Sequence, residues 1–345
     1  MRRLVSRHRA SSMAAVLVCL IGASMVAEAH AQEQPRTYDE ALVGRWMTEL
    51  SNWGRWGTDD ELGTLNLITP EKRRQAMALA RRGVVVSMEQ KVVLIPPPPQ
   101  QVDDTPLAIT FYDVTFKTMG AGDQPELAGW TSEVQRYHPH GYGTHVDALC
   151  HTSDGKGRLY NGFLLDEWVT PETGCGKTGL GLWTEGIVTR GILVDMTRLK
   201  DARGREPGSP VTVEDIEAWE EQVGVKVSPG DALFVYDPGP VRNGRPTRGG
   251  WDLSVLPWMK ARGVALTGGF ATTPGARLGG QVPGMQSADH RLALVALGMP
   301  LLDGPELAPL AEVAARENRW EFLFVMAPVP VPGGTGQIVN PLAMF

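Results

Sequence analysis

The sequence lacks the features that mark several large classes of binding proteins and cofactor enzymes. No long block of one charge sign occurs, although the chain has 33 Lys and Arg and 39 Asp and Glu, and its net charge of −6 is moderate. Such a chain has no electrostatic reason to hold nucleic acid or an anionic membrane surface. A phosphate-binding loop, a dinucleotide fingerprint and a haem motif are also absent, so we expect no organic cofactor.

Cysteine is scarce, with three residues in the whole chain. Cys19 lies in an N-terminal apolar segment, which leaves Cys150 and Cys175 for the folded protein. An oxidising compartment would allow these two to pair, and two separate buried thiols fit the sequence equally well.

The main apolar run, Met13–Ala27, is at the N-terminus. It follows a start with four arginines, and Glu28 and an Ala-His-Ala cleavage pattern at 29–31 follow it. This layout is typical of a secretory signal peptide, and the run is short for a membrane span of roughly 20 residues. We therefore predict a signal peptide over 1–31, a mobile leader over 32–45 and one domain over 46–345, in a periplasmic or secreted protein with no membrane contact after cleavage.

The remaining chain mixes helix and strand patterns without regular β-α-β alternation or an internal repeat. These patterns predict an α/β fold, a single compact domain with a mixed sheet. Caps and periodicity predict the helices, and β-branched or aromatic runs predict the strands. The expected helices cover 71–82, 212–222, 289–297 and 306–317, and the expected strands cover 84–88, 91–95, 110–116, 191–195, 231–236, 264–267 and 321–327.

The histidines are unevenly distributed. The chain has seven, of which five follow the predicted signal peptide, and four of these crowd into the run HPHGYGTHVDALCH at 138–151. Scattered core histidines would not cluster in this way. Because imidazole is the main neutral nitrogen ligand of proteins, the cluster indicates a metal or catalytic site.

The spacing inside this run predicts how its side chains meet. Residues two apart on a strand face the same way, so His145 and Asp147 would present an imidazole and a carboxylate side by side. If a helix begins near Asp147, His151 lies one turn further on and faces the same pocket. The sequence G-T-H-V also surrounds the catalytic histidine of subtilisin-like proteases, but the aspartate and serine motifs that such a protease needs are absent, so we reject that interpretation.

His290 is the distant imidazole that could complete the site. It begins an apolar helical pattern, and Asp303 lies one helix and a turn later, where a return loop could bring it beside His290. Glu306 competes with Asp303. Both carboxylates could instead cap the helix that begins near 306, which is the simpler interpretation for Glu306, whereas both interpretations stay open for Asp303.

Several segments together resemble the cyclase family of metal hydrolases, which includes bacterial kynurenine formamidase and isatin hydrolase. The run G-T-H-V-D-A-L-C-H resembles the family core H-x-G-T-H-x-D-x-x-x-H from its G-T-H onward. The segments WGTDDELGTLNLITPE, GRLYNG, GILVD, SPGDALFVY and PVPVPGGTGQIVNPLAMF also look like family segments. The resemblance extends over nearly the whole chain after the predicted signal peptide and implies that 46–345 is a cyclase-like hydrolase domain of the swivelling β/β/α type.

The resemblance also implies residue roles. His145 and Asp147 would bind metal, His290 and Asp303 would supply a second metal position, and His151 would be the catalytic acid/base. The first family histidine falls at Gly141, one residue after His140. Either a bulge in the glycine-rich run brings His140 into the pocket as a ligand, which we predict, or the first metal has one protein ligand fewer.

The function that these features predict is metal-dependent hydrolysis of an amide bond in a small aryl formamide or cyclic amide, with zinc or manganese as cofactor. The loop around Trp53 and Trp56, with the prolines at 96–99, could wall an aromatic substrate or could simply pack. A periplasmic metal or small-molecule binding protein with a degenerate site is the main alternative, and a lyase or dehydratase is another. Assembly into a homo-oligomer stays open.

Overall fold

The computed structural model describes residues 38–90, 110–118, 129–136, 139–140, 143–200, 205–242, 245–270, 282, 285 and 287–345. Its helices are α1 (Glu40–Glu49), α2 (Pro70–Met77), α3 (Leu165–Trp168), α4 (Val213–Val223), α5 (Val255–Arg262), α6 (Ala288–His290) and α7 (Ala308–Glu317), with the 3₁₀ turns η1 (Gly63–Leu67), η2 (Leu149–His151), η3 (Tyr160–Gly162), η4 (Leu180–Leu182) and η5 (Met196–Arg198) and the π-helical η6 (Arg291–Leu297). Its strands are β1 (Val85–Ser87), β2 (Thr110–Thr118), β3 (Gly129–Arg136), β4 (His145–Asp147), β5 (Val169–Thr170), β6 (Gly174–Cys175), β7 (Ile187–Asp195), β8 (Ala232–Tyr236), β9 (Pro238–Arg242), β10 (Arg245–Arg248), β11 (Leu266–Thr267), β12 (Leu301–Asp303), β13 (Glu321–Met326), β14 (Gly336–Ile338) and β15 (Leu342–Met344).

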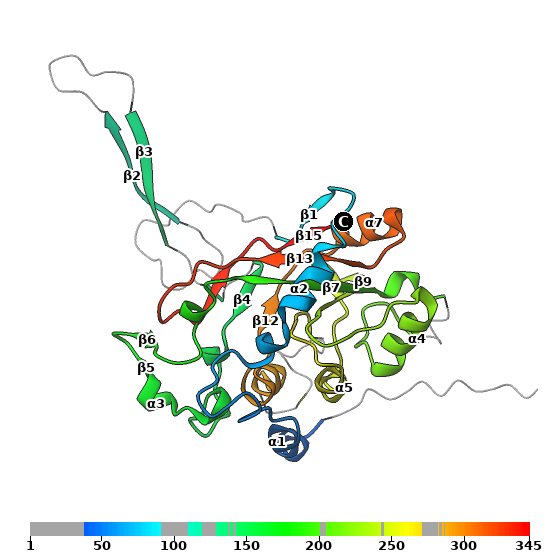
Figure 1. The fold of residues 1–345 in the computed structure, drawn as a ribbon, viewed down its shortest axis with the longest axis horizontal. Helices are drawn as coiled ribbons and strands as arrows, with labels where there is room; N and C mark the ends of the chain where they lie inside the picture. Colours follow the sequence, from blue (N-terminus) through cyan, green and yellow to red (C-terminus); the bar gives the residue numbers. More distant parts are fainter. Residues whose placement is uncertain are drawn as a thin grey trace, which may run out of the picture. The chain divides into compact units, whose positions relative to one another are not determined.

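A nine-stranded mixed sheet organises the residues from Thr37 to Phe345, which form one compact unit (Figure 1). Its order is β1-β15-β13-β7-β8-β11-β12-β4-β14. The central strands β7, β8, β11 and β12 are parallel, and antiparallel strands extend the sheet on both sides. The predicted α/β domain with a mixed sheet is therefore confirmed.

Successive side chains of the central strands point to opposite faces of the sheet. Each face packs in its own hydrophobic core, so these strands are buried on both sides. On β7, Ile192 packs in a core with the helices α4, α5 and η6, whereas its neighbour Leu193 packs in a second core with Phe322 and Phe324 of β13. Every residue of η6 from 292 to 297 is buried, so this helix lies against the sheet. The sheet and η6 are thus packed tightly against each other.

Most predicted elements are present with shifted ends. Helix α2 ends at Met77, five residues before the expected end, and β7 begins at Ile187, four residues earlier than expected. Helix α1 begins inside the segment expected as a mobile leader: the Asp39 side chain accepts a hydrogen bond from the Leu42 backbone N–H, and Val43 is 2% exposed. An N-cap and one buried apolar side chain therefore fix residues 40–45 as helix.

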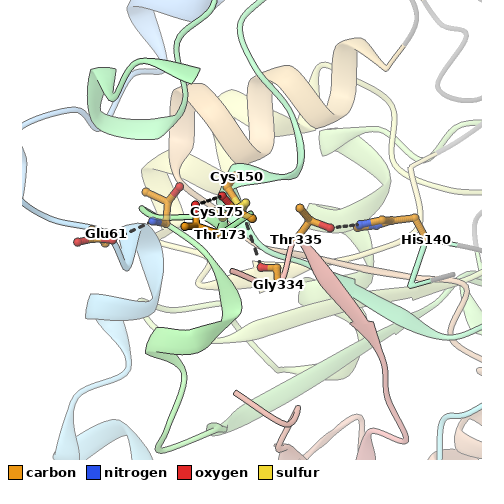
Figure 2. The surroundings of a disulfide bond; sticks show 9 residues. Glu61, His140, Cys150, Thr173, Cys175, Gly334 and Thr335 are labelled. Atoms are coloured by element: carbon orange, nitrogen blue, oxygen red, sulfur yellow. Dashed lines mark hydrogen bonds between the residues drawn. A yellow bond between two sulfur atoms is a disulfide. The ribbon is translucent and has the colours of Figure 1, made fainter. Parts of the chain in front are cut away.

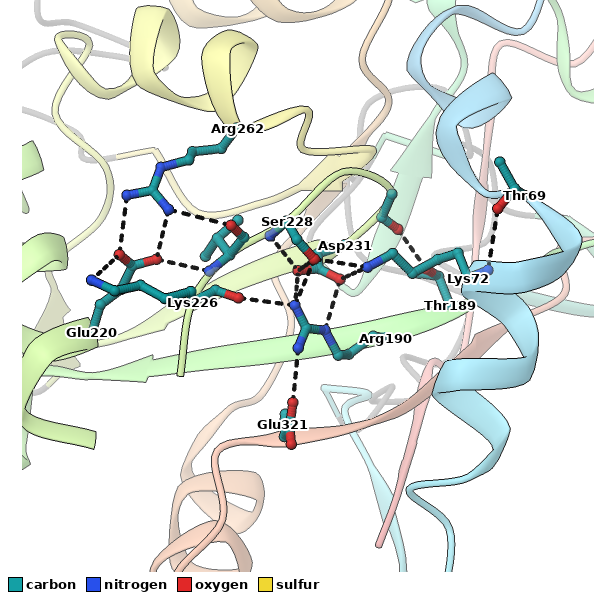
Figure 3. Close-up of polar contacts among 12 residues, drawn as sticks. Thr69, Lys72, Thr189, Arg190, Glu220, Lys226, Ser228, Asp231, Arg262 and Glu321 are labelled. Atoms are coloured by element: carbon teal, nitrogen blue, oxygen red, sulfur yellow. Dashed lines mark hydrogen bonds and ion pairs between the residues drawn. The ribbon is translucent and has the colours of Figure 1, made fainter. Parts of the chain in front are cut away.

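A buried ion network joins α2, β7, β13 and the start of β8 (Figure 3). Asp231 is fully buried, and its carboxylate accepts hydrogen bonds from Lys72 Nζ at 2.7 Å and from Arg190 Nε at 2.9 Å. Arg190 also pairs with Glu321 on β13 at 2.9 Å. Burial works against the charge on Arg190, but the carboxylate of Asp231 outweighs it and raises the pKa of the guanidinium. The network contributes to holding four elements in place.

Among the described residues, no helix is both long and apolar enough to cross a lipid bilayer. The predicted signal peptide at 1–31, residues 32–37 of the predicted leader, the expected strand at 91–95 and the prolines at 96–99 lie outside the described residues.

Candidate metal centre

The two central side chains of the site lie on β4. His145 and Asp147 are 9% and 0% exposed, and they face the same side of the strand with Val146 between them. His145 Nε2 lies 3.7 Å from Asp147 Oδ1. The side-by-side placement that follows from a two-residue spacing on a strand is therefore present.

Strand β12 brings a second carboxylate to the site. It pairs antiparallel with β4 so that Asp303 is directly opposite His145, and side chains in that relation are neighbours. Ligand atoms of His145, Asp147 and Asp303 all lie within 4.8 Å of one another. Asp303 thus arrives on a strand, and not on the return loop that the sequence suggested. Glu306 Oε1 instead accepts a hydrogen bond from the Ala308 backbone N–H at the start of α7, as the capping interpretation expects.

His290 reaches the same carboxylates from the end of α6. Its Nε2 lies 3.4 Å from Asp147 Oδ2 and 3.4 Å from Asp303 Oδ2. The fold therefore brings His290 and Asp303, which are distant in sequence from the histidine run, next to Asp147.

His140 and His151 close the remaining side of Asp147. Their rings stack with centroids 3.7 Å apart, and His140 Nδ1 lies 2.8 Å from Asp147 Oδ1. His151 belongs to η2, the turn that follows β4, and ligand atoms of these three residues also lie within 4.8 Å of one another. His138 and residues 141–142, where we expected the bulge, lie outside the described residues. With His140 beside Asp147, Gly141 no longer argues for a degenerate site.

Asp147 is the hub of this arrangement. Its Oδ1 faces His140 and His145, and its Oδ2 faces His290 but forms no hydrogen bond within the described part of the chain. Burial alone would raise the pKa of this carboxyl, but its contacts with His140 and His290 outweigh burial and hold the pKa well below its usual range. A buried, ionised and under-coordinated carboxylate among imidazole nitrogens fits a divalent cation.

The pKa values of His151 and His290 are shifted in opposite directions. Burial would lower the pKa of His290, but the carboxylates of Asp147, Asp289 and Asp303 outweigh it and raise that pKa well above its ordinary value. Burial lowers the pKa of His151 to about 4, and Asp147 offsets only part of this effect. At neutral pH His151 is therefore an uncharged imidazole with a lone pair, whereas His290 carries the positive charge that a cation beside Asp147 would replace.

Contacts behind the imidazole rings fix which nitrogen faces the centre. His145 Nδ1 lies 2.9 Å from the carbonyl oxygen of Gly143. A carbonyl oxygen only accepts, so Nδ1 carries the proton and leaves the Nε2 lone pair on the side of Asp147. His290 Nδ1 lies 3.1 Å from Asp289 Oδ1, an ion-pair contact without the geometry of a hydrogen bond. Such outer contacts typically orient histidine ligands of metals.

A disulfide anchors the turn that carries His151 (Figure 2). Cys150 and Cys175 are bonded with their Cα atoms 6.3 Å apart, which resolves the alternative left open by the sequence in favour of the pair. The Cys175 backbone N–H donates to the Gly333 carbonyl oxygen at 3.0 Å, and the Cys150 N–H donates to that of Thr178 at 3.3 Å. The segments around 175–178 and 333 are thereby tied to the position next to His151.

Trp53 has a structural contact that the sequence did not reveal. Its indole N–H donates to the carbonyl oxygen of Val295 in η6 at 2.7 Å, and the guanidinium of Arg158 lies over its ring. Trp53 therefore packs against η6, as expected if this loop has a packing role.

Sequence reasoning missed Thr335 altogether. Its Oγ1 lies 2.8 Å from His140 Nε2, although the two residues are 195 positions apart. The segment around Thr335 carried only a family resemblance. Nothing local marks the contact, because it arises from the pairing of β14 with β4.

Comparison with known proteins identifies the family. The Cyclase family model matches residues 72–269, which is more than half of the chain and includes the whole histidine run. The chain belongs to the cyclase family. The resemblance inferred from its motifs is therefore confirmed.

The chain is also similar to several solved structures. The crystal structure described as a novel cyclase is 27% identical, with a TM-score of 0.68 over 86% of this chain and 98% of that chain. An isatin hydrolase bound to the product analogue thioisatinate is 17% identical, with a TM-score of 0.47 over 75% of this chain and 91% of that chain. Isatin hydrolase A from Ralstonia solanacearum is 17% identical, with a TM-score of 0.46 over 80% and 97%. The comparison with curated proteins gives no match.

Proposed function

We propose that this member of the cyclase family is a metal-dependent hydrolase that cleaves an amide bond in an aryl formamide or a cyclic amide. The observation that supports it most directly is Asp147 Oδ2, a fully buried carboxylate oxygen without a hydrogen bond among the described residues. Ligand atoms of His140, His145, His151, His290 and Asp303 lie around the two oxygens of this carboxylate. A structural ion pair would need neither so many donors nor an unsatisfied oxygen at its centre.

The residues that would hold the metal are His140, His145, Asp147, His290 and Asp303. Mixed nitrogen and oxygen donors suit zinc or manganese. When bound, such an ion supplies Lewis acidity toward the amide carbonyl oxygen and toward a water molecule.

His151 is the group that would move the proton. Burial keeps its imidazole neutral at physiological pH, so one ring nitrogen can accept a proton from the attacking water. The same nitrogen can then deliver that proton to the leaving amide nitrogen. Stacking against His140 at 3.7 Å holds the ring in place beside Asp147.

The compartment that we propose is the periplasm or the extracellular space. The disulfide between Cys150 and Cys175 supports this, since disulfides persist in oxidising environments. N-terminal sequencing of exported protein should begin at or near Gln32. Full-length protein retained in the inner membrane would contradict the export proposal.

A panel of N-formyl aromatic amines and cyclic amides tests the activity. We expect turnover by the purified protein, with loss of turnover on adding a chelator and recovery with zinc or manganese. A cyclic amide should give one ring-opened product heavier by one water, and an N-formyl amine should give the free amine and formate, whose masses together equal substrate plus water. Turnover without a gain of water would indicate a lyase or dehydratase. Stoichiometric metal without turnover of any member would favour the binding-protein alternative.

A further inference from the structure

His140 is held at both ring nitrogens. Nδ1 lies 2.8 Å from Asp147 Oδ1, and Nε2 lies 2.8 Å from Thr335 Oγ1. A neutral imidazole has one N–H and one lone pair, so its partner at one nitrogen decides what the other nitrogen presents. The Asp147 carboxylate only accepts, so Nδ1 carries the proton in this arrangement and Nε2 accepts from the Thr335 hydroxyl. Because a hydroxyl can also accept, the same contact can hold an N–H at Nε2 when Nδ1 faces a cation.

Thr335 is itself fixed by the backbone. Its carbonyl oxygen accepts a hydrogen bond from the Ala148 N–H at 2.9 Å, directly after Asp147. The two preceding carbonyl groups accept from Leu180 at 2.9 Å and from Cys175 at 3.0 Å. The hydroxyl is therefore presented from a segment that the end of β4 and the disulfide-linked strand hold on both sides.

Gly336 makes the space that the His140 ring occupies. It lies opposite Asp147 in the pairing of β14 with β4. A Cβ atom on Gly336 would be 2.5 Å from His140 Cε1 and 2.7 Å from the Val146 carbonyl oxygen, closer than real Cβ contacts come. The backbone of Gly336 does not adopt a positive φ, so the need for glycine comes from this space and not from backbone conformation.

We infer that Thr335 and Gly336 together form a seat for His140, in which the Thr335 hydroxyl holds Nε2 and Gly336 admits the ring. Both are positioning residues that act through His140. The seat explains how a histidine one residue before the place implied by the family pattern still reaches Asp147. The consequence for metal binding rests on the proposed function, whereas the seat itself is a property of the protein chain.

A double-mutant cycle in the protein without its predicted signal peptide tests this. Thr335→Val removes the hydroxyl at nearly constant shape, and Thr335→Ser restores it. We expect Thr335→Val to weaken Co²⁺ binding roughly 10–100-fold, the usual cost of losing an outer contact to a histidine ligand, and Thr335→Ser to stay within a few-fold of wild type. In a His140→Ala background, Thr335→Val should have almost no further effect, because its target is gone. An equal loss in both backgrounds would overturn the proposal.

A matched control separates the seat from general destabilisation. Thr189→Val likewise deletes a threonine hydroxyl. Thr189 lies buried on β7, away from the histidines, and its hydroxyl donates to the Gly230 carbonyl oxygen. This variant should lower thermal stability without changing the Co²⁺ affinity. Gly336→Ala should weaken Co²⁺ binding at least as much as Thr335→Val, whereas Gly44→Ala, whose Cβ has free space around it, should leave binding unchanged.

Nitrogen-15 NMR of the histidine rings in metal-free protein gives a readout that needs neither metal nor activity. We expect one set of histidine signals to show an unprotonated Nε2 that accepts a hydrogen bond in wild type and in Thr335→Ser, and to lose that signature in both Thr335→Val and His140→Ala. An unchanged signature in Thr335→Val would overturn the seat even if the protein bound metal. Wild-type protein with the signature but without Co²⁺ binding would contradict the proposed function and leave the seat supported.

Discussion

At the scale of single residues, the site depends on one carboxylate that serves several neighbours. Asp147 faces imidazoles from β4, from α6, from η2 and from the segment before β4. Its two-residue spacing from His145 was readable in the sequence, because strand geometry alone places the two side chains together. The identity of the partners at each carboxylate oxygen was not readable, because it depends on which strands pair.

His151 can be separated from the metal ligands by mutation. We expect His151→Ala to lower turnover about 10²–10⁴-fold, the usual range for a lost acid/base group, while metal content hardly changes. Elemental analysis and steady-state kinetics on the same preparation measure both quantities. If metal is lost in step with turnover, His151 belongs to the ligand set, since its ring nitrogen is also within ligand distance of His140 and Asp147.

At the scale of elements, the disulfide joins the turn η2 to strand β6. It closes a segment with a sequence separation of 25 residues, and a cross-link of that span contributes about 3 kcal/mol in the chain-entropy account. Because Cys150 precedes His151, loss of the disulfide should also loosen the turn that carries His151.

The double variant Cys150→Ser/Cys175→Ser tests this role. We expect the free energy of unfolding to fall by about 2–4 kcal/mol and turnover to fall more than the loss of folded protein explains. Urea unfolding and kinetics with and without a thiol reductant measure these changes. Wild type should respond to the reductant and the double variant should not. Equal sensitivity of the two proteins would show that the disulfide does not carry the effect.

The elements of the fold differ in how well the sequence predicts them. Helix α4 was predicted within one residue, because Thr212 and Asp215 form a capping box and Gly224 ends the helix in the left-handed conformation. The short strands β12 and β14 were not predicted, since three residues carry too little pattern to mark a strand. Asp303 and Thr335 lie on or beside these strands, and so their contacts with the histidines appeared only in the structure.

At the scale of the whole molecule, the Asp231 network lies away from the site and stabilises the same sheet to which β4 and β12 belong. Asp231→Ala would leave Lys72 and Arg190 buried without their shared carboxylate. We expect a loss of about 3–5 kcal/mol in the free energy of unfolding, with metal affinity of the folded fraction unchanged.

Urea denaturation of Asp231→Ala, next to Glu71→Ala, measures this. Glu71 pairs with Arg74 on the exposed face of α2, and its loss should cost less than about 1 kcal/mol. A loss for Asp231→Ala as small as that for Glu71→Ala would argue against the network as a structural support.

The central claim is that the donors around Asp147 bind a divalent metal ion, and the metal content of purified protein tests it most directly. Asp147→Asn keeps the side-chain shape and removes the charge. We expect stoichiometric zinc or manganese in wild type after gel filtration and almost none in Asp147→Asn, with both proteins folded by circular dichroism. Wild type without metal that still hydrolyses its substrate in the presence of a chelator, or Asp147→Asn with full metal content, would contradict the account.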